Sequence, residues 1–192
     1  SNKAKCKEDF RFDMVKYRLL GLYADIEPTF AQLTTQLEAN PSRADAAAIH
    51  YGLGLVYARK SRREEALAHM KKALTINIFD PMVLLEMGRI YLLNGEPQKA
   101  LNVLEGLEAE PVMGVMARFH QAEAYLELRN LVKAKTLFNT IIDTDPSLYP
   151  QAYYNLANIL SLEKNPGLSH YYLGIYYSKI NNNKTAMLHL NK

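Results

Sequence analysis

The sequence has little of what marks a secreted, membrane-spanning or metal-binding protein. Its single cysteine, Cys6, cannot form an internal disulfide, which excludes a disulfide-stabilised scaffold and leaves the redox compartment open. Stretches without charge, such as residues 46–58, are shorter than the ~18 apolar residues that a membrane span needs. The chain opens without Met and without a signal-peptide pattern, so residues 1–3 are interpreted as a tag remnant. We therefore predict no membrane insertion.

The sequence also has no large excess of positive or negative charge. The 192 residues are 48% hydrophobic and 22% charged, which is typical of one compact domain or one continuous repeat array. The formal net charge of +3 is too small to predict nucleic-acid binding. The two ends of the chain are basic and its middle is acidic, an arrangement that can orient a partner but is equally typical of solvated helix surface.

Catalytic and cofactor-binding motifs are missing from the sequence. No H-E-x-x-H pair, P-loop, G-x-G-x-x-G or G-x-S-x-G occurs, and no Cys/His set has metal-ligand spacing. We therefore predict no catalytic residue, no metal and no cofactor, and a structural or surface role for each histidine: His50, His69, His120, His170 and His189. The basic cluster at residues 59–63 is interpreted as a solvated turn, with a phosphate or acidic-peptide contact as the alternative, because no aromatic residues are interleaved with it.

The main signal is an internal repeat with a period of about 34 residues. A small residue followed three positions later by tyrosine recurs at that period, as Gly54 with Tyr57, Gly88 with Tyr91, and Ala122 with Tyr125. At one fixed distance after each small residue comes an alanine, in the order Ala66, Ala100 and Ala134, and a last match consists of Gly174, Tyr177 and Ala186. Small residues on both helices of a pair let the helices approach closely, and the tyrosine fills the seam to the next pair.

This pattern resembles the tetratricopeptide repeat (TPR), a helix-turn-helix unit of the same period. The resemblance covers residues 46–192 and implies an all-α fold, a right-handed superhelix (α-solenoid) of antiparallel helix pairs with about four units, the last one truncated. Residues 4–45 are interpreted as a degenerate N-terminal helix pair with Gly21 as its small residue. Because the last helix stops at Lys192, before its closing small residue, we expect a longer parent protein.

Apolar periodicity and helix-end residues predict where the helices lie. The predicted ranges are 10–24, 28–39, 46–59, 62–76, 81–94, 97–109, 114–128, 131–143, 149–163, 167–179 and 184–192. Asp80 followed by Pro81 predicts a helix start, and Ser61 with Glu64 predicts a capping box. Ala157 and Gly174 are separated by only half of the repeat period. Either the helix after Pro166 acts as a second helix with first-helix residues, or a helix pair is offset there.

The TPR resemblance also implies a concave groove lined by the first helix of each unit. Its predicted residues are a column of large side chains, Tyr51, Leu85, Phe119 and Tyr154, with Leu55, Arg59, Arg89, Glu123 and Asn158 beside them. The lysines and asparagines of carboxylate-clamp members are missing at these positions. We therefore expect a protein or peptide partner held through an extended or helical apolar segment. The alternative is that these residues pack between neighbouring helices.

A second resemblance concerns the parent protein. Residues 12–20, 47–54, 59–66 and 169–174 are similar to the region after the catalytic domain in bacterial periplasmic zinc metallopeptidases. That resemblance implies the partner- or substrate-binding arm of such an enzyme, in the periplasm, with peptidase activity upstream of this chain. The alternative is a free-standing adaptor or scaffold. Self-association through exposed ends and RNA binding through residues 59–63 are further hypotheses.

Overall fold

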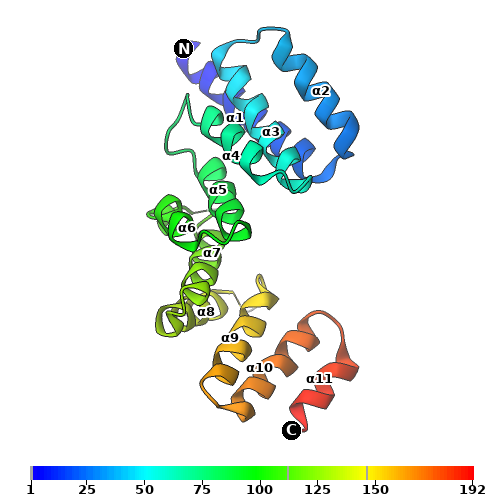
Figure 1. Ribbon diagram of the computed structural model, residues 1–192, viewed down its shortest axis with the longest axis vertical. Helices are drawn as coiled ribbons and strands as arrows, with labels where there is room; N and C mark the ends of the chain where they lie inside the picture. Colours follow the sequence, from blue (N-terminus) through cyan, green and yellow to red (C-terminus); the bar gives the residue numbers. More distant parts are fainter. Residues whose placement is uncertain (1, 112, 146) are drawn as a thin grey trace. The chain divides into compact units, whose positions relative to one another are not determined.

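The fold of the chain is entirely helical in the parts that the structure describes. The computed structural model describes residues 2–111, 113–145 and 147–192, and within them it has eleven α-helices, one short 3₁₀ helix and no strand (Figure 1). The predicted all-α class is therefore confirmed. Two compact units make up the chain, Ser1–Asn94 and Gly95–Lys192.

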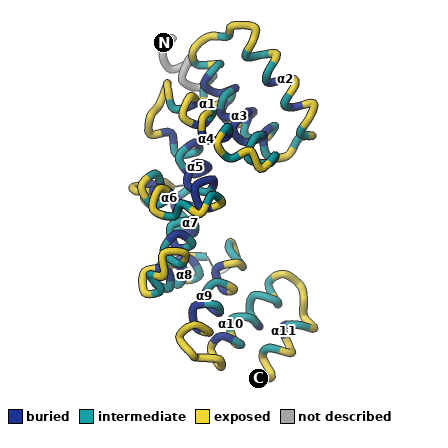
Figure 2. Tube along the Cα trace, in the orientation of Figure 1, coloured by how far each residue is buried: buried dark blue, intermediate teal, exposed yellow. Residues whose placement is uncertain are grey.

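The first unit contains five helices arranged around one of them. In chain order they are α1 (Asn2–Tyr23), α2 (Ile26–Glu38), α3 (Arg43–Arg59), α4 (Arg63–Ala73) and α5 (Pro81–Leu93). Helix α3 packs against each of the other four, and its middle is dark blue in Figure 2. The largest fully buried side chains of the unit are Tyr51, Met14, Leu33, Leu55, Met70, Leu85 and Ile90. The core of this unit therefore surrounds α3.

Glycines on the contact faces let these helices approach one another. A Cβ atom at Gly54 would lie 2.9 Å from Met70 Cε on α4, and one at Gly21 would lie 2.7 Å from Leu55 Cβ. Such distances are shorter than real Cβ contacts, so a Cβ at Gly21 would push against α3, and one at Gly54 would require the end of the Met70 side chain to shift.

The helix starts agree with the sequence at Asp80 and differ from it at Ser61. Asp80 Oδ1 accepts hydrogen bonds from the backbone N–H of Met82 at 3.1 Å and of Val83 at 3.2 Å, so the predicted cap of α5 is confirmed. The capping-box prediction at Ser61 is wrong. Ser61 has a left-handed backbone (φ 59°), and α4 begins one residue later than a Ser61 cap requires.

That left-handed residue recurs with the repeat. Ser61, Gly95 and Arg129 have φ angles of 59°, 69° and 60°, and they follow one another at the repeat period. After Ser61 and Arg129, the next backbone N–H donates to the carbonyl of the repeat tyrosine, at 2.9 Å and 2.8 Å respectively. This is the hydrogen bond of a Schellman-type helix end. The turn of each repeat therefore needs a left-handed residue, and only Gly95 is a glycine.

The second unit is a chain of helices in which each packs mainly on its sequence neighbours. In order they are α6 (Pro97–Leu104), the 3₁₀ helix η1 (Leu107–Ala109), α7 (Gly114–Glu127), α8 (Leu131–Thr144), α9 (Pro150–Leu162), α10 (Pro166–Lys179) and α11 (Asn183–Leu190). A core cluster joins α7, α8 and α9 through Phe119, Ala122, Ala134, Phe138, Ile141, Ala152, Leu156 and Ile159.

Helix α10 packs against two neighbours, α9 and α11. Ser169 Oγ donates a 2.9 Å hydrogen bond to the Ala157 carbonyl on α9, while a Cβ at Gly174 would lie 2.5 Å from Leu190 Cδ2 on α11. Helix α10 is therefore the second helix to α9 and the first helix to α11. This is the first of the two arrangements that the sequence left open.

Four predicted helix bounds differ from the structure by three residues or more. Helix α3 begins at Arg43 rather than at residue 46. Helix α1 begins at Asn2 rather than at residue 10, because residues 3–8 include the good helix formers Lys, Ala and Glu. Helix α4 ends at Ala73 rather than at residue 76. The predicted helix 97–109 is divided into α6 and η1, because Gly106 between them has a left-handed φ of 83°.

Candidate functional site

The predicted column of large groove residues lies mostly in the core. Tyr51 is 0% exposed, Leu85 1% and Phe119 7%, and Leu55 is fully buried as well. Of the column, Tyr154 alone is exposed, at 41%. For Tyr51, Leu55, Leu85 and Phe119 the burial therefore favours the alternative that the sequence left open, in which these side chains pack between neighbouring helices instead of lining a groove.

The polar residues of that prediction are engaged within their own units. Arg59 donates to the carbonyls of Gly21 at 3.1 Å and Ala24 at 2.7 Å, which satisfies the end of α1. The Arg89 guanidinium pairs with Glu86 at 2.8 Å, and Glu123 Oε2 accepts a hydrogen bond from His120 Nδ1 at 2.9 Å. Asn158 is half-buried on α9.

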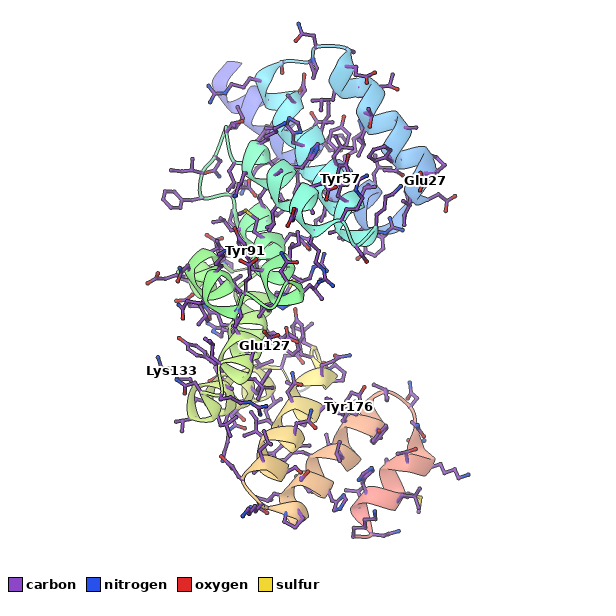
Figure 3. The ribbon with its side chains drawn as sticks, in the orientation of Figure 1. Glu27, Tyr57, Tyr91, Glu127, Lys133 and Tyr176 are labelled. Atoms are coloured by element: carbon purple, nitrogen blue, oxygen red, sulfur yellow. The ribbon has the colours of Figure 1, made fainter. Side chains whose placement is uncertain are left out.

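The residues predicted to pack between helices are mostly enclosed. Those buried in their units are Gly54, Ala66, Gly88, Tyr91, Ala100, Ala122, Ala134, Gly174 and Ala186, while Tyr57, Tyr125 and Tyr177 are half-buried. Tyr57, labelled in Figure 3, lies between Phe30 of α2 and His69 of α4, with ring centroids 5.4 Å and 5.1 Å away. The tyrosine thus fills a seam between helices.

A cleft in the second unit offers a concave surface on residues that the sequence did not single out. It has a volume of about 540 Å³ and is formed by α6, η1, α7 and α8. Two hydrogen bonds hold η1 and the end of α6 against α7: Arg118 donates to the Glu108 carbonyl at 2.9 Å, and Gln121 Nε2 donates to the Leu104 carbonyl at 3.1 Å. The cleft wall is therefore fixed by hydrogen bonds between elements.

One wall of this cleft carries a pair of amide side chains on α6. Gln98 Nε2 donates to Asn102 Oδ1 at 3.2 Å, one turn of helix apart. That bond leaves the Gln98 side-chain carbonyl as an acceptor and the Asn102 amide nitrogen as a donor on the described lining. A donor and an acceptor side by side match the N–H and C=O groups that an extended polypeptide presents.

The α8 side of the cleft carries Val132, Lys133, Thr136 and Leu137. Val132, on the first turn of α8, is 76% exposed, and Leu101 lines the cleft from α6. Lys133, labelled in Figure 3, lies 4.9 Å from the ring centroid of Tyr125. These residues lie on α6 and α8, the second helices of their pairs, whereas the sequence prediction considered first helices only. The sequence signal that could have indicated this cleft is Val132, an apolar residue that does not lie on the buried face of α8.

Two histidine pairs join helices in nearly the same way. The Nδ1 atoms of His50 and His69 are 3.0 Å apart, and those of His170 and His189 are 2.9 Å apart. One ring must donate and the other accept, so in each pair the accepting Nδ1 atom carries no proton. Burial, with the His50 and Lys72 charges adding to it, lowers the pKa of His69 to about 4. Burial also lowers the pKa of His50 and, with the His170 charge, that of His189.

Neither a metal site nor a membrane span is seen in the described ranges. Nowhere in these ranges do three His, Cys, Asp or Glu side chains gather where they could hold a metal ion. Among the described helices, none combines the length and apolar character that crossing a bilayer requires.

Comparison with known proteins identifies the repeat. The sequence model of the tetratricopeptide repeat family matches residues 31–81 and 85–149, which is more than half of the chain. No curated protein matches the sequence.

Solved structures of repeat proteins are similar to this chain. YrrB, described as a TPR protein with an unusual peptide-binding site, is 22% identical with a TM-score of 0.68, over 94% of this chain and 91% of that one. PilW, a widely conserved type IV pilus biogenesis factor, is 15% identical with a TM-score of 0.75, over 94% and 90%. PilF of Pseudomonas aeruginosa is 17% identical with a TM-score of 0.70, over 94% and 90%. At these identities the likeness concerns the fold alone.

Proposed function

We propose that this chain, which belongs to the tetratricopeptide repeat family, is a non-catalytic adaptor that holds an extended segment of a partner protein in the cleft between α6, α7 and α8. The family supports a binding role, and the peptide-binding site named for YrrB is a precedent on a similar fold. The cleft volume of about 540 Å³ falls within the usual range of ligand sites.

The observation that carries the proposal is the wall formed by Gln98 and Asn102. Their unused carbonyl and amide nitrogen pair with the backbone of an extended segment whatever its side chains are. Exposed Val132 and its neighbour Leu137 then take an apolar side chain of the ligand. Backbone pairing supplies general affinity and the apolar wall supplies selectivity.

Selection of peptides followed by point variants tests this proposal. A displayed library of random peptides is selected on the full chain, and the dissociation constants of the recovered peptides are measured with the purified protein. We expect Asn102→Ala and Val132→Glu each to weaken binding by roughly tenfold, since both remove contacts at the centre of the cleft.

The matched control for Val132→Glu is Val15→Glu, because both valines are exposed on helices and only Val132 lines the cleft. Val15→Glu is expected to leave binding unchanged. Selected peptides that bind Val132→Glu and Asn102→Ala as tightly as the natural sequence would show that the cleft is not the binding site.

The narrower hypothesis, an accessory arm of a periplasmic zinc metallopeptidase, rests on the sequence segments alone. Nothing in the matches reported above supports that parentage, and the adaptor explains the observations at least as well. Antibody capture of the native protein from fractionated cells separates the two. Chelator-sensitive proteolysis in a much larger periplasmic protein favours the enzyme arm, while a band near 21.8 kDa without proteolysis favours the adaptor.

A further inference from the structure

The charged side chains that line the cleft of α6, η1, α7 and α8 lie at two different ends of it. At one end, Lys133 of α8 lies over the ring of Tyr125 on α7 (Figure 3). At the other end, Arg118 of α7 donates to the main-chain carbonyl of Glu108 on η1. Tyr125 and Arg118 are about two turns apart on α7, roughly 10 Å along its axis. The lysine is therefore remote from the η1 end of the cleft.

The η1 end of the cleft carries two carboxylates that have no cationic partner. Glu105 and Glu108 both line the cleft, one on each side of the left-handed Gly106. Glu108 Oε2 accepts a 3.2 Å hydrogen bond from Gln121 Nε2, which is a neutral donor. Neither carboxylate forms an ion pair within the described ranges, because Arg118 bonds the Glu108 main chain instead. The negative charge of this end is therefore open to a ligand.

The segment of the chain that forms the cleft also has an excess of acidic residues. Residues 95–145 contain eight aspartates and glutamates against five lysines and arginines. Two of these lysines are already engaged by carboxylates, since Lys99 pairs with Glu96 and Lys135 pairs with Glu163. A ligand that approaches the cleft therefore meets a negative field, which favours a basic group over an acidic one.

The carboxylates continue the line of amide side chains on α6. Gln98 and Asn102 are one turn apart, and Glu105, which caps the end of α6, is one turn beyond Asn102; all three line the cleft. That turn corresponds to about 5 Å along the helix axis. An extended segment advances about 3.3 Å per residue. A side chain one or two residues from the backbone group that pairs with Asn102 therefore reaches the two carboxylates.

We propose, building on the function proposed above, that the bound segment carries a lysine or arginine whose charged group binds between Glu105 and Glu108. Its N–H donors pair with the carboxylate oxygens that the described structure leaves without a cation. Val132 and Leu137, on the α8 side, hold the apolar side chain of the same segment. The two glutamates thus select a basic residue and set which residue of the segment occupies the η1 end.

Peptides recovered from the random library test this inference on the full chain. We expect them to share a lysine or arginine near an apolar residue. Each is resynthesised with that lysine acetylated or that arginine replaced by citrulline, which removes the charge and keeps the length of the side chain. Because Glu105 is exposed and Glu108 half-buried, the dissociation constant should rise by about threefold to tenfold at low salt, and by less at high salt.

A double-mutant cycle shows whether the peptide charge meets these glutamates. Glu105→Gln and Glu108→Gln should each weaken binding of the unmodified peptide by a similar factor and leave binding of the neutral peptide almost unchanged. The matched control is Glu110→Gln, because Glu110 is exposed at the end of η1 and does not line the cleft. It should leave both dissociation constants unchanged, and circular dichroism checks that each variant keeps its helices.

The outcomes separate this inference from the proposed function. Peptides that lose affinity in Asn102→Ala but bind Glu105→Gln and Glu108→Gln unchanged would overturn the inference and leave the cleft as the binding site. Recovered peptides without a shared basic residue would overturn it as well. Peptides that bind Asn102→Ala and Val132→Glu as tightly as the natural sequence, or a library that yields no binder, would contradict the proposed function and this inference with it.

Discussion

Helices α3–α4 and α10–α11 have nearly the same motif and the same internal contacts, yet one pair is enclosed and the other is open. The same residue types stand at matched positions of the two pairs, among them Tyr51 and Tyr171, Gly54 and Gly174, and His69 and His189. In both, a glycine lets the second helix approach, and a histidine pair with a neighbouring tyrosine joins the helices. What differs is the third helix, which is α5 for the first pair. A repeat motif therefore fixes the geometry inside a helix pair, while the neighbouring elements decide which of its residues are core.

Replacing the matched tyrosines by alanine has the largest expected effect. Tyr51→Ala removes a fully buried ring and should lower the free energy of unfolding by about 3–5 kcal/mol, whereas Tyr171→Ala, at a half-exposed ring, should change it by less than about 1 kcal/mol. Urea denaturation followed by circular dichroism measures both. Tyr51→Phe is the control: the Tyr51 hydroxyl is buried with no partner in the described structure, so its loss should cost nothing.

Replacing the matched glycines by alanine should change the free energy of unfolding of the two helix pairs by different but smaller amounts. In Gly54→Ala the new Cβ meets the end of the Met70 side chain, which is fully buried and must repack within the core, so we expect a loss of about 1–3 kcal/mol. In Gly174→Ala it meets the half-exposed Leu190, which can swing into solvent, and the better helix propensity of alanine offsets the remainder. Thermal unfolding of the two variants side by side checks this, and equal losses would contradict it.

The histidine pairs predict a loss of stability in acid that is larger for α3–α4. The pKa of His69 is lowered to about 4, so the unfolded chain takes up protons first as the pH falls below the ordinary histidine value near 6.5. The contribution of His69 to the free energy of unfolding is complete above pH 6.5 and is lost between about pH 6.5 and 4. After allowance for partial exposure of the ring, it amounts to about 1–2 kcal/mol. The pKa of His189 is lowered for the same reason in a more exposed place.

Denaturant unfolding at several pH values, for the natural chain and for His69→Gln and His189→Gln, measures these contributions. The slope of stability against pH should flatten more in His69→Gln. His120→Gln is a suitable control because His120 contacts Glu123 rather than a second histidine. If the free energy of unfolding of the natural chain does not fall between pH 6.5 and 4.5, the lowered pKa of His69 is contradicted.

The smallest expected effect concerns the matched left-handed turns. Ser61 and Asn181 have φ angles of 59° and 61°, where glycine has no steric penalty. Ser61→Gly should raise the melting temperature through a gain of about 0.5–1 kcal/mol, and Asn181→Gly should gain less because asparagine tolerates this conformation better. Destabilisation by Ser61→Gly in a calorimetric scan would show that the turn is held by the serine itself.

The repeat made most of the fold predictable from sequence. The repeat spacing, together with apolar periodicity and helix-end residues, placed the eleven helices of the described structure, because these signals act within one helix or one helix pair. The misplaced bounds fall at Gly106, where the left-handed backbone interrupts a helix-like pattern, at the first turns of α1 and α3, and at the end of α4. The spacing of the repeat residues reports neither the backbone conformation at Gly106 nor the helix propensity of residues 3–8.

The candidate site was far less predictable. Tyr51 and Phe119 are at repeat positions that the resemblance assigns to a groove, but their burial depends on how closely the next elements pack. Arg59 donates hydrogen bonds to carbonyls at the end of α1, and these contacts join residues that are distant in sequence. The cleft exists because η1 turns back onto α7 through Arg118 and Gln121, and no local pattern predicts that turn.

Photo-crosslinking of a selected peptide tests the central claim, that this repeat protein binds an extended segment in the cleft of its second unit. Benzoylphenylalanine replaces Val132 in one version of the full chain and Tyr171 in another, so the cleft and the open face of α10–α11 are compared with the same peptide. The account predicts crosslinks from position 132 that excess unlabelled peptide removes, and few from position 171. Crosslinks from position 171 alone, or from neither, would contradict it.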